Sequence, residues 1–348
     1  MGRFRAFGQR RLGQRELERS GLERWSHITP FKHFSTGIST AIRVGLLSLP
    51  CSLLGGVLAF STPVSAQADR PAPSSASPAP LSNSLMAQLD RAVNRQDLPA
   101  ALQLFSANFS HSDGLTRQSL ETALTQLWKQ YPNLTYRTEV TQSKMTAAGI
   151  TALETVTHIT GQRVTTEGQE WSIAGTIKAT QHLQNDKILR QEILSEKISL
   201  SLGERPPTVK LAMPDAVGIA QSYNFEAIVQ EPVGEDLLMG AILEETVNPA
   251  LVVNPDRLRI EFPSVAELLT DRELIRPPKL PPQTKRLKLK RLRAGGFFKI
   301  GRSANVPETR WITAVLARHD AGMTIVTQRL RTTGKSEHRG KTAFIPNF

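Results

Sequence analysis

Apolar residues recur at helical spacing in the segment that follows residue 80. Leu85 and Leu89 fall on one face of a first stripe, and a second stripe runs from Leu98 to Phe109. Asp97 stands directly before the second stripe, where its carboxylate can cap a helix N-terminus. The spacing therefore predicts two short helices, the second of them extending through Phe109.

A third apolar stripe begins at Thr116 or Ser119 and carries Leu120 and Leu124 on one face. It ends at Tyr131, because the residue before a proline is pushed out of the α region. This pattern predicts a longer amphipathic helix with a polar outer face.

The pattern changes from helical to alternating after Pro132. Four long stretches are rich in Thr, Ile and Val, and short polar turns separate them. Consecutive strands with short turns predict an antiparallel meander, and helices followed by strands predict an α+β unit over residues 81–203. The four predicted strands are 134–145, 150–164, 170–184 and 187–202.

A second folded unit is expected over residues 206–333, after a proline-containing linker. Its alternating segments are short and regularly spaced, which is typical of an immunoglobulin-like β-sandwich. Residues 248–284 interrupt the pattern with many prolines and predict a long inserted loop. Residues 334–348 are expected to form a disordered tail.

The N-terminal segment has the order of an export signal. Basic residues come first, an uncharged apolar run follows Arg43, and small residues precede Ala66 and Ala68. Residues 1–68 are therefore expected to be a signal peptide, and the Pro/Ala/Ser-rich residues 69–80 a spacer. An uncleaved membrane anchor is the alternative. The implied location is the periplasm, thylakoid lumen or extracellular space, with membrane contact only if the segment stays attached.

The net charge and cysteine content of the expected mature chain differ from those of the full sequence. The chain has 348 residues, a net charge of +12 and a single cysteine, Cys51. Residues 1–43 hold nine Lys or Arg against three Glu, which is half of the net charge. The expected mature chain is thus mildly basic and contains no thiol, so it can form neither a disulfide nor a cysteine-based metal site.

Acid–base chemistry would need two titratable groups within reach of one substrate. His158 and Glu154 share one face of a predicted strand, and Tyr136 lies on the preceding strand. These three are weak catalytic candidates, since a histidine on such a strand is more often a surface or satisfied residue. His111 and Asp113 also titrate, but the surrounding "SHSDG" favours an ordinary turn.

Aromatic residues could instead line a small-molecule pocket in the first unit. Trp171, Tyr131 and Trp128 are the candidates. Core packing is the competing interpretation of all three, because large aromatic side chains dominate protein cores.

A basic run, "KRLKLKRLR", lies at residues 285–293. Arg286, Lys288, Lys290 and Arg291 could form a surface for anionic lipid or polysaccharide. The alternative is a strand whose leucines face inward while its cations are solvated. No aromatic residues interleave with the charges in the way that base stacking requires, so nucleic acid is not expected.

The order of elements over residues 81–203 resembles the nuclear-transport-factor-2-like (SnoaL-like) family. The helical stretch 84–109, the "SHSDG" turn, the helix through "SLETALTQLWKQYP" and the four long strands carry this likeness. The resemblance implies a cone in which a curved antiparallel sheet wraps a long helix and leaves a pocket at its open end. Family members include isomerases, dehydratases and hydrolases, and others that only bind ligands or dimerise.

The full layout also resembles a group of exported cyanobacterial proteins that join such a domain to a C-terminal β-domain. "YNFEAIVQEPVGEDLLMGAILEE", "AGGFFKIGR", "RWITAVL" and "MTIVTQRLR" carry this second likeness. It implies location and fold more than activity, and residues 248–284 depart from the pattern.

No signature of a reaction is present in the sequence. Walker A, paired CxxC, HExxH, G-x-S-x-G and G-x-G-x-x-G motifs are all lacking. We therefore expect an exported, non-catalytic binding or assembly protein without cofactor or metal, whose partner is a second copy or a small apolar ligand. The alternatives are an isomerase- or dehydratase-like enzyme in the cone, and an envelope adaptor that uses the basic run.

Overall fold

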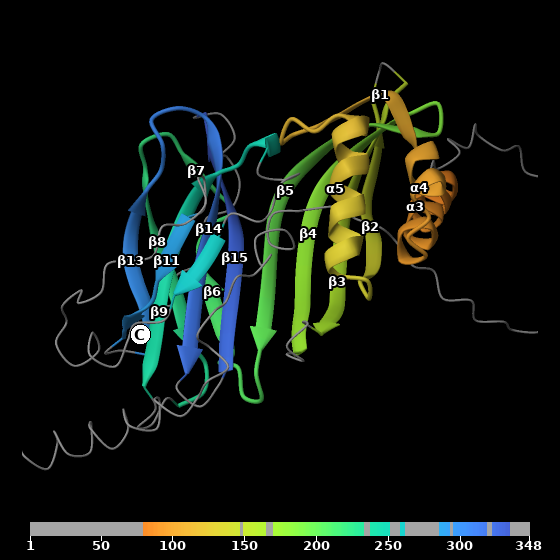
Figure 1. Ribbon diagram of the computed structural model, residues 1–348. Coiled ribbons are helices and arrows are strands. Elements are labelled where there is room, and N and C mark those ends of the chain that lie inside the picture. The colour runs from red at the N-terminus through yellow and green to blue at the C-terminus, as the bar shows by residue number, and fades with distance from the viewer. Residues whose placement is uncertain are drawn as a thin grey trace, which may run out of the picture.

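The structure is a computed structural model, shown in Figure 1. It describes residues 79–146, 149–164, 170–232, 237–250, 258–261, 285–292, 295–318 and 322–334. The predicted export segment, nearly all of the spacer, most of the 248–284 loop and almost all of the tail lie outside these residues. No helix in the described ranges is long and apolar enough to cross a membrane.

Helices α3 (Ala79–Asn94), α4 (Leu98–Gln103) and α5 (Arg117–Gln130) precede the long strands. Asp97 caps α4 as predicted, accepting a hydrogen bond of 3.0 Å from the amide of Ala100. Thr116 caps α5, with Ser119 returning a bond to the Thr116 amide. Both caps satisfy amides that lack partners within the helix.

The prediction that the second helix continues through Phe109 is wrong. The chain leaves α4 at Gln103 and forms strand β1 (Phe105–His111), which runs parallel to a later strand. Phe105 and Phe109 are still buried and meet edge to face, with ring centroids 4.8 Å apart. Their spacing of four residues suits the same face of a strand as well as that of a helix, so periodicity alone misled the prediction.

The four predicted long strands are present and pair in an antiparallel meander. They continue into a single ten-stranded sheet whose main order is β12-β9-β14-β15-β5-β4-β3-β2. β1 and β7 attach to β5 and β15 off this path. The bounds are β2 Thr135–Met145, β3 Thr151–Val164, β4 Glu170–Gln184, β5 Lys187–Leu202, β7 Ala216–Gly218, β9 Leu238–Thr246, β12 Lys290–Arg291, β14 Glu308–Arg318 and β15 Gly322–Thr333.

This sheet corrects the expected fold class. An α+β cone followed by a separate β-sandwich is not what the chain forms, because β15 pairs antiparallel with β5 from Met323–Leu202 to Gln328–Lys197. The described residues are mostly antiparallel β-structure, and the two expected units share one sheet (Figure 1). The alternating pattern predicted β5 and β15 as separate strands but could not predict a pairing between segments about 120 residues apart.

A three-stranded sheet packs against the C-terminal half of the large sheet. Its order is β13-β8-β6, with bounds Gly296–Arg302, Ser222–Val229 and Val209–Ala212. Phe225 and Ala227 meet Ile312, Ala314 and other side chains of the large sheet in one apolar cluster. A separate pair of parallel strands joins β10 (Leu258–Glu261) to β11 (Lys285–Lys288).

Strands β14 and β15 are buried on both faces. Trp311 and Val315 belong to the cluster shared with the helices, whereas Ile312 and Ala314 belong to the cluster shared with the three-stranded sheet. The hairpin therefore lies at the centre of the molecule, between two layers. The β14 sequence from Trp311 to Ala317 is mostly apolar, as double burial favours, whereas β15 also buries polar side chains such as Thr327 and Arg329.

The outer edge of β2 is covered by α3, which lies beside it (Figure 1). Asn94 accepts a 2.8 Å bond from the amide of Tyr136 and donates a 2.9 Å bond to its carbonyl. One turn earlier on α3, Asp90 accepts a bond of 3.4 Å from the Thr138 amide. These side chains pair with backbone groups that an edge strand would otherwise leave open.

Candidate functional site

Three buried charged side chains lie together where the turn after β1 meets β15 beside β5. β4 pairs with β5 along nearly its full length, so both of the other strands must lie on its opposite side. β1 occupies residues 188–191 of β5, and β15 occupies residues 197–202. Glu196 stands between these two segments, and Arg329 of β15 reaches it there.

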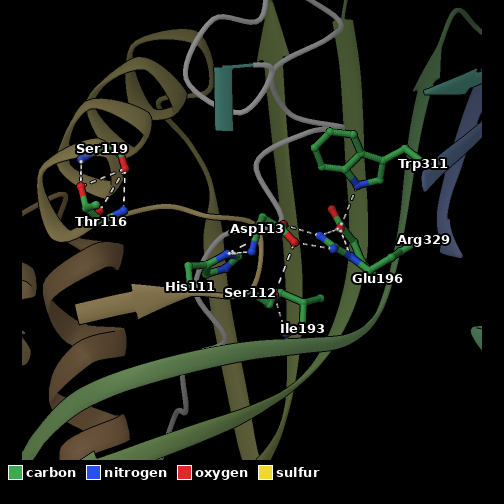
Figure 2. Close-up of polar contacts among 9 residues, drawn as sticks. All are labelled: His111, Ser112, Asp113, Thr116, Ser119, Ile193, Glu196, Trp311 and Arg329. Carbon is green, nitrogen blue, oxygen red and sulfur yellow. Dashed lines mark hydrogen bonds and ion pairs between the residues drawn. The ribbon is translucent and has the colours of Figure 1, made fainter. Parts of the chain in front are cut away.

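Arg329 is fully buried and binds two carboxylates. Its Nη1 and Nη2 donate to the two oxygens of Asp113, each over 2.7 Å, in a bidentate pair. Its Nε and Nη2 donate to Oε2 of Glu196 over 3.0 and 2.9 Å. The Trp311 indole donates to the same oxygen over 3.1 Å, as Figure 2 shows. We call Asp113, Glu196, Trp311 and Arg329 the Arg329 junction.

Register explains why these side chains meet. Trp311 lies directly opposite Arg329 in the β14–β15 pair, so both point to the same face of the sheet. The Arg329 guanidinium lies 5.8 Å from the centre of the Trp311 ring, within cation–π distance. Neighbours on this face of the same strands, such as Met323 and Ile325, are apolar core residues. The junction is thus a buried cluster of charged side chains that lies next to apolar core residues on the same face of the sheet.

The turn after β1 brings Asp113 to the junction. The Asp113 amide donates to Nδ1 of His111 over 3.0 Å, and the Ser112 hydroxyl accepts from the Ile193 amide over 3.2 Å. The Ser112 amide also donates to the Gln191 carbonyl, which holds the turn against β5. The turn predicted from "SHSDG" is present, and its acidic residue faces inward (Figure 2).

The two carboxylates of the junction titrate differently. Burial would raise the pKa of Asp113, but the Arg329 charge and its paired hydrogen bonds outweigh burial and lower it. For Glu196, burial outweighs the opposing effects of Arg329 and Trp311, and the Asp113 charge adds to it, so its pKa is raised. The Arg329 charge therefore outweighs burial in setting the pKa of Asp113 but not in setting the pKa of Glu196.

His111 is neutral at pH 7. Burial lowers its pKa to about 4 and outweighs the attraction of Asp113. Its Nδ1 lies 3.8 Å from the Asp113 carboxylate, but this contact is no ion pair while the ring is uncharged. The ring instead acts as an acceptor that fixes the turn.

The predicted catalytic residues do not come together. Tyr136 is buried on the helix-covered face of the sheet, beside core residues such as Ile159. Glu154 is exposed and His158 half-buried, and both lie on the opposite face. His158 Nδ1 lies 3.5 Å from the Thr176 hydroxyl on that outer face. The sheet therefore separates Tyr136 from the other two.

The predicted pocket residues are core residues. Trp128, Tyr131 and Trp171 are all buried within the main apolar cluster. A cavity beside them, lined by residues such as Leu127, Tyr136 and Ile198, measures about 10 Å³, room for roughly one water. None of the three aromatic candidates lines it.

The basic run forms short strands, with its leucines directed inward. Leu287 and Leu289 are buried, Lys288 is half-buried, and Lys290 and Arg291 are exposed on β12 at the edge of the large sheet. The side chain of Arg286 is outside the described residues. Binding of an anionic surface by this run stays a prediction.

Sequence reasoning missed three of the four junction residues. Asp113 is a titratable candidate for which the sequence favours a turn role, and the sequence assigns no role to Glu196, Trp311 or Arg329. One signal was available: Glu196 occupies an inward position of a strand whose following residues alternate toward the core, and Arg329 lies within a strand that is buried on both faces. An inward charge requires a partner, although sequence alone does not identify it. No group of acidic, histidine or cysteine side chains in the described ranges could hold a metal ion.

A family model described as "domain of unknown function (DUF8623)" matches residues 204–265 and 273–333, less than half of the chain. The match includes β15 but not its sheet partner β5. No curated protein matches the sequence.

Several solved structures show weak similarity. A Mycobacterium tuberculosis protein of unknown function has 15% identity and a TM-score of 0.24, with 32% of this chain and 68% of that chain covered. Δ5-3-ketosteroid isomerase from Mycobacterium sp. has 12% identity and a TM-score of 0.22, covering 32% and 88%. A computationally designed 17-OHP binder has 10% identity and a TM-score of 0.22, covering 31% and 88%. At these scores the likeness assigns neither fold nor function to the whole chain.

Proposed function

We propose that the chain is a non-catalytic binding or assembly protein whose interior serves stability and whose surface makes contacts. The observation that carries this proposal is the filled space between α5 and the sheet. Its cavity of about 10 Å³ admits roughly one water, whereas pockets for drug-sized ligands measure roughly 300–1,000 Å³.

The buried titratable groups also support a structural role. Asp113 and Glu196 both bind Arg329, and His111 uses its Nδ1 to hold a turn. Burial raises the pKa of Asp90 to about 9, so this carboxyl is largely neutral at pH 7 and cannot act as a general base there. An acid–base enzyme would need at least one such group open to a substrate.

Apolar ligand binding tests the filled interior. We expect no saturable shift of the melting temperature when the native protein is titrated with benzene or indole. Leu127→Ala removes a buried side chain from the cavity wall and should create a dry cavity that binds benzene and raises the variant's melting temperature. Val164→Ala, at a residue that is 66% exposed, is the matched control and should bind nothing.

A saturable thermal shift in the native protein that disappears in Leu127→Trp would contradict the proposal. It would show that an apolar ligand enters the interior, and would favour the enzyme or pocket alternatives.

Export is the second part of the proposal, and the segment concerned lies outside the described residues. Its support is the order of basic, apolar and small residues before Ala68. Mass spectrometry of the protein from its native cells should give an N-terminus at Gln67 or Asp69. An intact Met1 on membrane-bound protein would instead identify an anchor.

A further inference from the structure

Strand β13 exposes two large apolar side chains side by side. Phe298 is 62% exposed and Ile300 is 74% exposed, and both point outward from the three-stranded sheet. Single exposed apolar residues are ordinary, but a contiguous apolar pair on an edge strand is the arrangement that favours strand pairing with another chain. Among the described strands, β13 pairs only with β8.

Hydrogen bonding shows which backbone groups of β13 are open. The Val229 amide donates to the Gly295 carbonyl, and the Ser303 amide donates to the Gln221 carbonyl, so residues 295 and 303 face β8. Facing alternates along an antiparallel strand, so residues 297, 299 and 301 also face β8. The amides and carbonyls of Phe298, Ile300 and Arg302 therefore point away from the sheet.

We infer that this edge of β13 binds β13 of a second copy of the chain in antiparallel orientation, about a two-fold axis at Lys299. The inference rests on the proposed function and specifies its partner. In this register Phe298 lies opposite Ile300 of the partner subunit, and Ile300 lies opposite Phe298 of the partner subunit. Both pairs use the open backbone groups, which gives four new hydrogen bonds between the copies.

Side-chain complementarity favours a second copy over another partner. The two-fold axis sets an aromatic side chain against a β-branched one twice, a pairing that stabilises sheets. Arg302 lies opposite Gly296 of the partner subunit, so it meets no like charge. Two-fold dimers require a patch that complements itself, and residues 296–302 meet that requirement.

The charge of Lys299 is already balanced. Its side chain points to the inner face, where Nζ binds Oε1 of Glu244 at 2.8 Å. On the axis it would face Lys299 of the partner subunit, with each lysine paired to the Glu244 of its own chain, which Arg310 also contacts at 3.8 Å. Lysines protect many edge strands from pairing, but this one is directed away from the open edge.

Sedimentation equilibrium of the full chain tests the inference. We expect the native protein to form a concentration-dependent dimer. Ile300→Lys should abolish it at concentrations where the native protein is dimeric, with an unchanged melting temperature of the monomer because the site is exposed. Val164→Lys, an equally exposed position on β3, should dimerise like the native protein.

A charge-pair variant tests the register. Phe298→Lys combined with Ile300→Glu sets Lys opposite Glu in both pairs, and should restore a dimer that salt weakens. Phe298→Lys combined with Ile300→Lys should stay monomeric. Any register in which residue 300 faces itself would pair Glu with Glu and give no dimer.

A native protein that stays monomeric, or a dimer that Ile300→Lys leaves intact, would overturn the inference. Neither result would touch the proposal of a filled interior, which the benzene titration tests separately.

Discussion

Arg329 is the residue on which the interior depends most. It is fully buried, and its guanidinium pairs with both Asp113 and Glu196 in the protein interior. A buried ion pair adds little over a well-packed apolar replacement, yet removal of one partner leaves an uncompensated charge. An uncompensated charge here would destabilise β5, β14, β15 and the turn after β1, because all four contribute side chains to the junction.

We expect Arg329→Ala to lower the free energy of unfolding by about 3–5 kcal/mol, because two carboxyls lose their cation. Urea denaturation measures this loss. Arg137→Ala is the matched control: it removes an arginine from an exposed ion pair with Glu139, and should cost at most about 1 kcal/mol. Adding Asp113→Asn and Glu196→Gln to Arg329→Met should recover part of the loss. Equal costs at both arginines would contradict the account.

His111 makes the folding stability of the protein depend on pH in the acidic range. Its folded pKa of about 4 lies below the ordinary value of 6.5, so the unfolded state binds more protons between these pH values. The stabilisation is complete above pH 6.5 and is lost as pH falls toward 4. Relative to His111→Asn, which keeps an acceptor for the Asp113 amide, the native protein should lose up to about 1.4 kcal/mol per pH unit in this window. A difference independent of pH would show that the histidine titrates normally.

At the scale of single residues, the sequence predicted which side chains are buried better than it predicted which residues they contact. Tyr131, Trp128 and Trp171 were candidates for a pocket and are buried among core residues, an alternative that the sequence had left open. Glu196 and Arg329 are separated by over 130 positions, so nothing local links them. Their contact follows from a strand register that only the folded sheet defines.

At the scale of elements, α3 and β2 form a unit that relies on side-chain hydrogen bonds to backbone. Asp90 and Asn94 take the place of a neighbouring strand along the edge of β2. Burial raises the pKa of Asp90 to about 9 and outweighs the Arg137 and Arg91 charges. The folded state therefore holds a proton on Asp90 that the unfolded chain releases above about pH 4.

Asp90→Asn should match the native protein in stability near pH 4 and exceed it increasingly as pH rises toward 9. The stabilisation by protonated Asp90 is complete below its ordinary pKa and is lost as pH approaches the folded value, whereas asparagine cannot ionise. Thermal denaturation across this range measures the difference. Gln88→Asn, on an exposed site of the same helix, is the control without a titratable group. A native protein that gains stability relative to Asp90→Asn as pH rises would refute the assignment.

Helices and strands were predicted correctly where the hydrophobic periodicity and the length of the segment indicated the same type of element. The four long strands follow from alternation, the start of α4 from the cap at Asp97, and α5 from its helical spacing after Thr116. β1 was predicted as helix because two phenylalanines four residues apart fit both structures. Its parallel pairing with β5, 80–83 residues later, makes this segment a strand, and such a distant partner leaves no signal in the local sequence.

At the scale of the molecule, a boundary predicted near residues 203–206 runs through a continuous sheet. β5 before the boundary hydrogen-bonds to β15 after it, and the Arg329 junction joins the same two strands to the turn after β1. The family model that begins at residue 204 also divides this sheet. Both boundaries divide the chain at one point in the sequence, whereas hydrogen bonds between β5 and β15 join the segments on either side of it.

Differential scanning calorimetry tests most directly the claim that the two halves form one cooperative unit. We expect a single transition whose calorimetric and van't Hoff enthalpies agree, and a shift of the whole transition to lower temperature in Arg329→Ala. Two separate transitions, with Arg329→Ala moving only one of them, would contradict the claim.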